Sequence, residues 1–229
     1  MQRGMLVVID GTDGSGKKTQ TELLVARLRD EGIAVEKIDF PQYGKKSAAP
    51  TEEYLNGVYG DASQITAYQA SILYAVDRFD ASFQIKKWLD EGKVVVSDRY
   101  VSANMGHQAG KILDLQERER FLEWVEELEY GIFAIPRPDL QFFLYVDPEL
   151  SRQQALKVEK CNMDKAKDIH ENDAQHMLNA SEAFRYVAEK YGWEQIDCMK
   201  AGEMRSRAEI AEELYQRFST LYLERAGSF

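Results

Sequence analysis

The chain alternates short apolar runs with longer segments in which apolar residues recur at helical spacing. The first run, MLVVI (5–9), is five consecutive apolar residues with β-branching, typical of a strand covered on both faces. The next segment, from Lys18 to Glu31, has helical periodicity and ends before Gly32, which suits a left-handed helix end. This start predicts a strand followed by a helix.

The same alternation continues without an internal repeat or a low-complexity linker. A closing helix is introduced by Ser206, with Glu209 three residues later as a capping box. Further strands are predicted at 34–40, 94–97, 140–146 and 194–199, with helices at 63–91 and up to Tyr191. Five strands alternating with helices predict an α/β protein, a three-layer αβα fold with a five-stranded parallel sheet. Ligands of such folds bind at the carboxyl ends of the strands, so we expect functional residues directly after strands.

Composition narrows the class of protein. A length of 229 residues fits one domain, and a net charge of −10 argues against broad binding to nucleic acid, which relies on Lys and Arg. No stretch approaches the roughly 18 apolar residues of a membrane span, and the N-terminal apolar run is too short for a signal peptide. Cys161 and Cys198 have neither CxxC nor metal-ligand spacing, which favours two thiols over a disulfide. We expect a cytoplasmic protein without a membrane partner.

A glycine-rich segment, GTDGSGKKTQ (11–20), directly follows the first strand and opens the first helix. Its glycines would let backbone N–H groups converge on phosphate oxygens at a helix N-terminus, and Lys17 would reach the β and γ phosphates. The alternative is a glycine-rich turn without a ligand. The segment predicts a fold of the P-loop NTPase type, with ATP phosphates bound by Gly11, Gly14, Ser15, Gly16, Lys17, Lys18 and Thr19.

Lys18 departs from the template of such loops, which have Ser or Thr there to hold magnesium. Thr19 does not replace that hydroxyl, because successive helical residues point about 100° apart. Since Mg²⁺ keeps several waters, a water can fill the position. We therefore expect a magnesium-dependent loop with altered metal affinity.

The segment VVVSDRY (94–100) places Asp98 and Arg99 at the end of a predicted central strand. This placement suits a carboxylate that holds Mg²⁺, directly or through water, and an arginine that clamps a phosphate. An Asp–Arg pair on the surface is the alternative.

In QASILYAVDRFD (69–80), Tyr74 and Arg78 are four residues apart and share a helix face. An aromatic ring beside a guanidinium can stack on a base and bond its edge. Taken alone, a solvated surface pair remains the more ordinary interpretation.

Together, GTDGSGKKTQ, DFPQY, LYAVDRFD, VVVSDRYVSANMGHQ, PRPDLQFFLYVDPE and DIHEND resemble the thymidylate kinase family, in this order and over nearly the whole chain. The resemblance implies transfer of the γ-phosphoryl group of ATP to dTMP in a magnesium-dependent cytoplasmic homodimer. It also implies one domain over 1–229, with a lid at about 151–170.

The resemblance assigns roles to individual residues. It makes Asp13 a carboxylate near the acceptor sugar and phosphate, and it groups Asp13 with Lys17, Asp98 and Arg99 as catalytic. Tyr74 takes the place of the ring that stacks on thymine and Arg78 that of the arginine at the base edge. The dTMP-binding set it implies is Asp13, Tyr43, Tyr74, Arg78, Arg99, Asn104, His107 and Gln108.

The chain departs from the family pattern at several positions. Gln42 stands where many relatives have arginine, and Ala103 where relatives often have a hydroxyl residue, with Ser102 only as a shifted neighbour. His107 replaces a common tyrosine that crowds the sugar 2′ position, so discrimination against ribonucleotides is in question; an ordinary helix histidine is the alternative.

The expected lid is poor in arginine. Its implied functional residues are Arg152, Lys165, Lys167 and Glu171. A solvated charged helix is the alternative for most of its lysines. The competing functions are another P-loop nucleotide or deoxynucleoside kinase, and a nucleotide-binding homologue that has lost catalysis.

Overall fold

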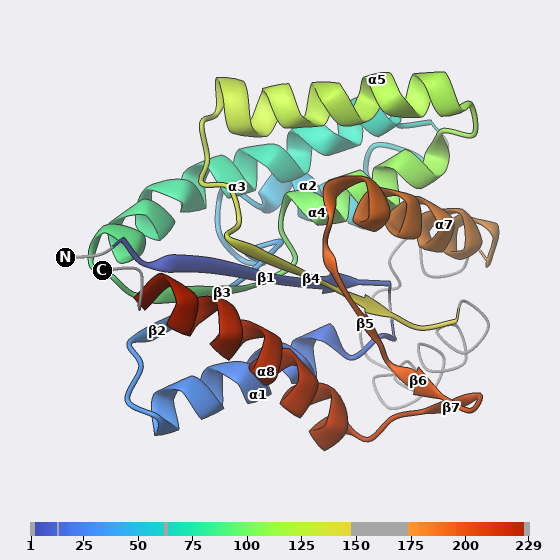
Figure 1. The fold of residues 1–229 in the computed structure, drawn as a ribbon. Helices are drawn as coiled ribbons and strands as arrows, with labels where there is room; N and C mark the ends of the chain where they lie inside the picture. Colours follow the sequence, from blue (N-terminus) through green and yellow to red (C-terminus); the bar gives the residue numbers. More distant parts are fainter. Residues whose placement is uncertain (1–2, 13, 62–63, 148–173, 227–229) are drawn as a thin grey trace.

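The protein is described here by a computed structural model that covers residues 3–12, 14–61, 64–147 and 174–226. Its middle layer is a five-stranded parallel sheet with strand order β2-β3-β1-β4-β5 (Figure 1). The strands are β1 (Met5–Gly11), β2 (Val35–Asp39), β3 (Val94–Asp98), β4 (Leu140–Tyr145) and β5 (Glu194–Asp197). The predicted three-layer αβα fold with a five-stranded parallel sheet is confirmed.

One face of the sheet is covered by α1 (Lys17–Asp30) and α8 (Arg207–Ala226), which lie side by side in Figure 1. Val7 and Ile9 of β1 point to this face and pack in one cluster with Leu28 of α1 and Leu214 of α8. Every residue of β1 is buried, because the central strand has helices on both sides. This is the physical reason for its continuous apolar run.

The opposite face is covered by a larger set of helices. Leu6 and Val8 of β1 pack there with Ile85 and Phe121 of the helical layer. This layer consists of α2 (Ala49–Leu55), α3 (Ala67–Asp90), α4 (Val101–Ala103), the π-helix η1 (Asn104–Gln108), the 3-10 turn η2 (Ala109–Lys111), α5 (Leu115–Glu126), the π-helix η3 (Glu127–Ile132) and α7 (Ala174–Tyr191).

Several element boundaries differ from the sequence prediction, among them the start of α3 and the end of β5. The helix expected from residue 63 begins at Ala67, because Thr66 accepts a hydrogen bond from the Gln69 N–H and the Gln69 side chain accepts one from the Thr66 N–H. The strand expected over 194–199 ends at Asp197. Beyond it the chain forms an antiparallel hairpin, β6 (Met199–Lys200) and β7 (Glu203–Met204), whose two turn residues both have positive φ.

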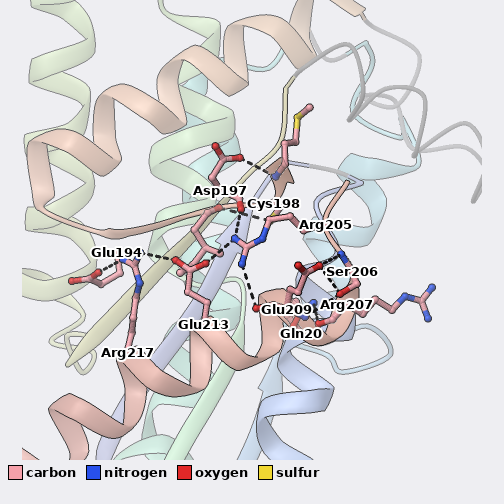
Figure 2. A network of polar contacts seen from close by, with 12 residues as sticks. Gln20, Glu194, Asp197, Cys198, Arg205, Ser206, Arg207, Glu209, Glu213 and Arg217 are labelled. Carbon is pink, nitrogen blue, oxygen red and sulfur yellow. Dashed lines mark hydrogen bonds and ion pairs between the residues drawn. The ribbon is translucent and has the colours of Figure 1, made fainter. Parts of the chain in front are cut away.

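Polar contacts fix the start of α8 (Figure 2). The predicted capping box is confirmed: the Ser206 Oγ accepts from the Glu209 N–H at 3.2 Å, and the Glu209 carboxylate accepts from the Ser206 N–H at 3.0 Å. Arg205 donates to the Glu213 carboxylate at 2.7 Å, and the Gln20 side chain of α1 donates to the Arg207 carbonyl at 3.1 Å. The helix that follows the phosphate loop is thereby joined to the last helix of the chain.

Among the helices that the structure describes, none combines the length and apolar character that crossing a membrane requires.

Candidate active site

The glycine-rich loop connects β1 to α1, as the sequence predicts. Gly14 and Gly16 have φ of 79° and 84°, in the left-handed region that glycine adopts without a steric cost. At Gly11 a Cβ would lie 2.6 Å from the carbonyl oxygen of Leu144 on β4. Glycine at these positions permits the tight turn and the close approach of two strands beneath it.

The side chains of the loop leave polar groups available for phosphates. Lys17 is only 8% exposed, and its Nζ donates to the Thr12 carbonyl at 3.1 Å. The Ser15 Oγ is buried and makes no hydrogen bond within the described part of the chain. Lys18 is exposed and Thr19 half-buried, so Lys18 does not enter the interior in place of the usual hydroxyl.

Asp98 ends β3 at the same edge of the sheet, in register with Ile9 of β1 and Asp39 of β2. Burial raises the pKa of Asp98, while the positive charges of Lys17 and Arg99 act in the opposite direction. Its Oδ1 is buried and has no hydrogen-bond partner among the described residues. An anionic oxygen without a donor beside a phosphate loop fits a Mg²⁺ site.

No group of three or more His, Cys, Asp and Glu residues suited to a metal occurs in the parts of the chain that the structure describes. A Mg²⁺ ion that retains waters and binds nucleotide phosphates needs only one or two protein ligands. A single carboxylate at the strand end is therefore sufficient.

Asp10 is a candidate site residue that the sequence analysis did not single out. It is fully buried; one carboxylate oxygen accepts from the Gly11 N–H at 2.8 Å and the other from the Ser102 hydroxyl at 2.6 Å. Burial raises the pKa of Asp10, opposed by the charges of Arg99 and Lys17 and by the Ser102 hydrogen bond. The signal in the sequence was a carboxylate at the end of an apolar strand, immediately before the first glycine of the loop.

Arg99 follows Asp98 with φ of 66°, which is uncommon for a residue other than glycine. The conformation is held at both backbone groups: the Arg99 N–H donates to the Ile9 carbonyl at 3.0 Å, and the Ser97 hydroxyl donates to the Arg99 carbonyl at 2.6 Å. Its guanidinium lies 2.9 Å from the Nε2 of His107. Arg99 is thus set beside β1, near the phosphate loop, and its charge acts on Asp10 and Asp98.

Tyr74 is half-buried on α3 and meets Tyr54 of α2 edge to face, with ring centroids 6.2 Å apart and an interplanar angle of 87°. Tyr54 is fully buried, and its hydroxyl accepts from the Lys111 Nζ at 2.8 Å. The ring expected to stack on a base is therefore supported from the side by a second aromatic residue.

Arg78 does not lie on the surface, so the alternative of a solvated Tyr74–Arg78 pair is wrong. Arg78 is 1% exposed. Its Nε donates to both carboxylate oxygens of Glu129, and one Nη donates to the Tyr100 carbonyl at 3.3 Å. Asn104 Nδ2 lies 3.3 Å from the same Glu129 carboxylate. Glu129 in η3, which the sequence reasoning did not single out, joins two of the implied dTMP-binding residues.

Gln108 and Asn104 share the short helix η1 and are both buried. Asn104 Nδ2 also donates to the Ser71 carbonyl at 3.1 Å, which joins η1 to α3. The Gln108 Oε1 and the Ser71 hydroxyl make no hydrogen bond within the described residues. These groups give the region unsatisfied hydrogen-bonding capacity of the kind that a polar ligand can use.

The DFPQY segment is tied to α3 through Gln42. The Gln42 N–H and side-chain amide both donate to the Asp77 carboxylate, at 2.7 and 3.0 Å. Lys45 donates to the Gln42 side-chain oxygen at 2.5 Å. Tyr43, next in the chain, is 65% exposed. Gln42 therefore anchors the segment, and Tyr43 remains accessible.

Several implied site residues lie outside the described residues. They are Asp13 of the phosphate loop and the lid residues Arg152, Lys165, Lys167 and Glu171.

A glycine-rich loop between a strand and a helix, with an aspartate and an arginine at the end of the adjacent parallel strand, defines a P-loop phosphotransferase of the α/β class. The model of the family described as thymidylate kinase matches residues 9–191, which is more than half of the chain. The chain belongs to the thymidylate kinase family.

Individual relatives agree with this membership. The chain is 31% identical over 190 residues to a thymidylate kinase of Mycobacterium tuberculosis, a match that spans 82% of this chain and 87% of that protein. It is 31% identical over 149 residues to a thymidylate kinase of Schizosaccharomyces pombe, covering 65% and 64% of the two chains. The solved structure of a thymidylate kinase from Candida albicans superposes with a TM-score of 0.72 at 21% identity, over 95% of this chain and 92% of that one, and supports the fold.

The resemblance seen in the sequence is thus confirmed. The expected activity, phosphorylation of dTMP by ATP to give dTDP, is the activity of this family, and the comparisons favour it over another kinase or a non-catalytic homologue.

Proposed function

We propose that this chain catalyses ATP-dependent phosphorylation of dTMP as one domain, using the site described above. One observation carries the proposal: the Arg99 N–H donates to the Ile9 carbonyl at 3.0 Å, so Arg99 lies beside the end of β1 that leads into the phosphate loop with Lys17. A cation suited to the donor and a cation suited to the acceptor therefore meet at one edge of the sheet. Phosphoryl transfer needs this arrangement, because two anions must be aligned and their repulsion neutralised.

The donor end is formed by the phosphate loop. Its backbone N–H groups and the Ser15 hydroxyl bind ATP phosphate oxygens, and Lys17 neutralises the β and γ phosphates. Lys18 adds positive charge from the solvent side, where it is exposed. Thr19, half-buried at the start of α1, completes the contact region.

Asp98 would hold the magnesium ion, directly or through a water. When bound, Mg²⁺ would neutralise the negative charge that develops on the phosphates during transfer. The buried Asp98 oxygen without a donor supports this role.

The acceptor end extends from Arg99 into the region between α3 and η1. Arg99 clamps the dTMP phosphate, Tyr43 lies beside that phosphate, and Tyr74 stacks on thymine. The base edge is bonded by Arg78, Asn104 and Gln108, and Asp13 contacts the sugar 3′-hydroxyl. The buried guanidinium of Arg78 supports this assignment, because Glu129 holds it in one orientation while two of its five N–H groups make no hydrogen bond to the described residues.

The reaction needs no dedicated general base. An oxygen of the dTMP phosphate is already anionic and forms the bond to the γ-phosphorus, while the bond from that phosphorus to the β–γ bridging oxygen breaks and ADP leaves. The lid at about 151–170, with Arg152, Lys165, Lys167 and Glu171, would close over the nucleotides, since an open site would hydrolyse ATP.

A homodimer is part of the proposal. Ile72, Val76, Phe79 and Phe83 recur on one side of α3 and are all exposed, Phe83 at 63%. Phe79 and Phe83 contact each other at 5.3 Å between ring centroids. A second copy of α3 would cover this apolar stripe.

Phe83→Glu would place two charges in such an interface, and we expect it to convert a dimer to a monomer in sedimentation equilibrium. Gln84 is also exposed and follows Phe83 in the chain, so Gln84→Glu is the matched control. This variant should remain dimeric. A wild-type protein that is monomeric at micromolar concentration would contradict the dimer.

The central experiment is a coupled assay of ADP release with ATP and Mg²⁺. We expect fast turnover with dTMP and slower turnover with dUMP, since one methyl group is worth about 1–3 kcal/mol. Thymidine, CMP and the reaction without acceptor should give almost no ADP. Lys17→Met should abolish turnover. ATP binding without stimulation by any acceptor would contradict the proposal, and preference for another acceptor would favour a different kinase.

The cytoplasmic location expected from the sequence belongs to the same proposal, and fractionation of cells would test it.

A further inference from the structure

The contact between Arg99 and His107 has a definite chemical meaning. Guanidinium groups donate hydrogen bonds and do not accept them. The His107 Nε2, 2.9 Å from an Nη of Arg99, must therefore be the acceptor. The Nε2 atom therefore carries no proton in this contact, and the neutral imidazole of His107 has its proton on Nδ1.

The imidazole ring is held firmly in this orientation. It meets Phe184 of α7 edge to face, with ring centroids 5.1 Å apart and an interplanar angle of 89°. Phe184 in turn stacks on Phe143 of β4 at 5.6 Å. Gly106, the residue before His107, permits this packing, because a Cβ there would lie 2.3 Å from the Phe184 ring.

The neutrality of His107 distinguishes Arg99 from the other arginine of the site. Arg78 is paired with the Glu129 carboxylate, which compensates its charge. A neutral acceptor can orient a guanidinium without cancelling its charge. Arg99 is thus aimed by His107, a partner that adds no negative charge to those of Asp10 and Asp98 nearby.

We propose that His107 is a positioning residue for the acceptor phosphate, which acts by accepting a hydrogen bond from Arg99. This inference rests on the proposed function, in which Arg99 binds the phosphate of dTMP. It gives His107 a task distinct from crowding the sugar 2′ position. The hydrogen bond from Arg99 to His107 should therefore strengthen the binding of dTMP, which carries the phosphate, and not the binding of thymidine, which lacks it.

Two substitutions separate the hydrogen bond from the packing. His107→Phe keeps an aromatic ring against Phe184 and removes the acceptor. His107→Gln places an amide oxygen near the position of Nε2 and restores an acceptor. Calorimetry with the full chain, in the absence of ATP, would compare the binding of dTMP and of thymidine to the wild type and both variants.

We expect His107→Phe to weaken dTMP binding about tenfold, the effect of one hydrogen bond to a charged group, and to leave thymidine binding unchanged. His107→Gln should recover most of the loss. In the kinetic assay, the KM for dTMP should rise in His107→Phe while the KM for ATP stays constant. Equal losses for dTMP and thymidine would show a structural role only and overturn the inference, as would unchanged dTMP binding in His107→Phe.

A spectroscopic test does not depend on a substrate. The chain has three histidines, and His107→Gln assigns the ¹⁵N imidazole resonances of His107 by their disappearance. We expect the shift pattern of an Nδ1–H tautomer near neutral pH; an Nε2–H tautomer or an imidazolium would overturn the inference. Failure of the wild type to phosphorylate dTMP would instead overturn the proposed function, so the two failures are distinguishable.

Discussion

The Arg78 guanidinium and the Glu129 carboxylate form an ion pair in which the two side chains are 1% and 0% exposed. Removing one member of such a pair leaves a buried charge uncompensated. We expect Glu129→Ala to lower the free energy of unfolding by about 3–5 kcal/mol, measured by urea denaturation.

Glu126→Ala is the control for this prediction. Glu126 pairs with Arg137, whose side chain is 62% exposed, and loss of such a surface pair should cost about 0–1 kcal/mol. Similar small losses for both variants would show that water reaches the Arg78 guanidinium and compensates it.

Asp98 is expected to set the magnesium requirement. Asp98→Asn removes the anionic oxygen while keeping the shape of the side chain, so the Mg²⁺ concentration for half-maximal rate should rise by about 10- to 100-fold. Asp39→Asn, at the neighbouring strand end and with a side chain 53% exposed, should leave this concentration unchanged. Initial rates at fixed ATP and varied free Mg²⁺ measure both, and identical curves for Asp98→Asn and the wild type would remove Asp98 from the metal site.

Gly106 should not tolerate a methyl group. Alanine normally stabilises a helical position relative to glycine by about 1 kcal/mol, but here its Cβ would lie 2.3 Å from the Phe184 ring. We expect Gly106→Ala to destabilise the protein by about 1–3 kcal/mol in urea denaturation. In a Phe184→Leu background the same substitution should cost much less, because the clashing ring atoms are gone. Equal costs in both backgrounds would contradict this explanation.

Lys111 should make stability depend on pH in the alkaline range. Burial lowers the pKa of Lys111 to about 8 from its ordinary value of 10.5. Below pH 8 the amine is protonated in both the folded and unfolded states, and the cost of the buried charge is fully present. Between pH 8 and 10.5 the folded state loses the proton first, so this cost is relieved as pH rises.

The stability of the wild type relative to Lys111→Met should therefore increase from pH 8 to pH 10, as measured by urea denaturation at several pH values. Lys87→Met, which removes an exposed lysine of α3, is the matched control and should show a constant difference. A constant difference for Lys111→Met as well would contradict the prediction.

Local sequence patterns predicted the sheet and the ends of its helices. The run MLVVI is a fully buried strand, and Gly32, predicted to follow the first helix in the left-handed conformation, has φ of 77°. These features depend on residues close in the sequence, through backbone conformation and side-chain periodicity. The same reasoning overextended the fifth strand, because nothing local marks where pairing with β4 ends and the β6–β7 hairpin begins.

The sequence by itself determined the order of strands and helices, and it predicted which residues would carry the chemistry: the phosphate loop with Lys17, and Asp98 with Arg99 after the third strand. Only the tertiary structure decided how these residues are supported. Glu129 is 51 residues from Arg78, and Ser102 is 92 residues from Asp10, yet each pair is in direct contact. Such contacts arise when buried polar groups must find partners in a packed interior. A single sequence does not show which distant partner the fold will supply.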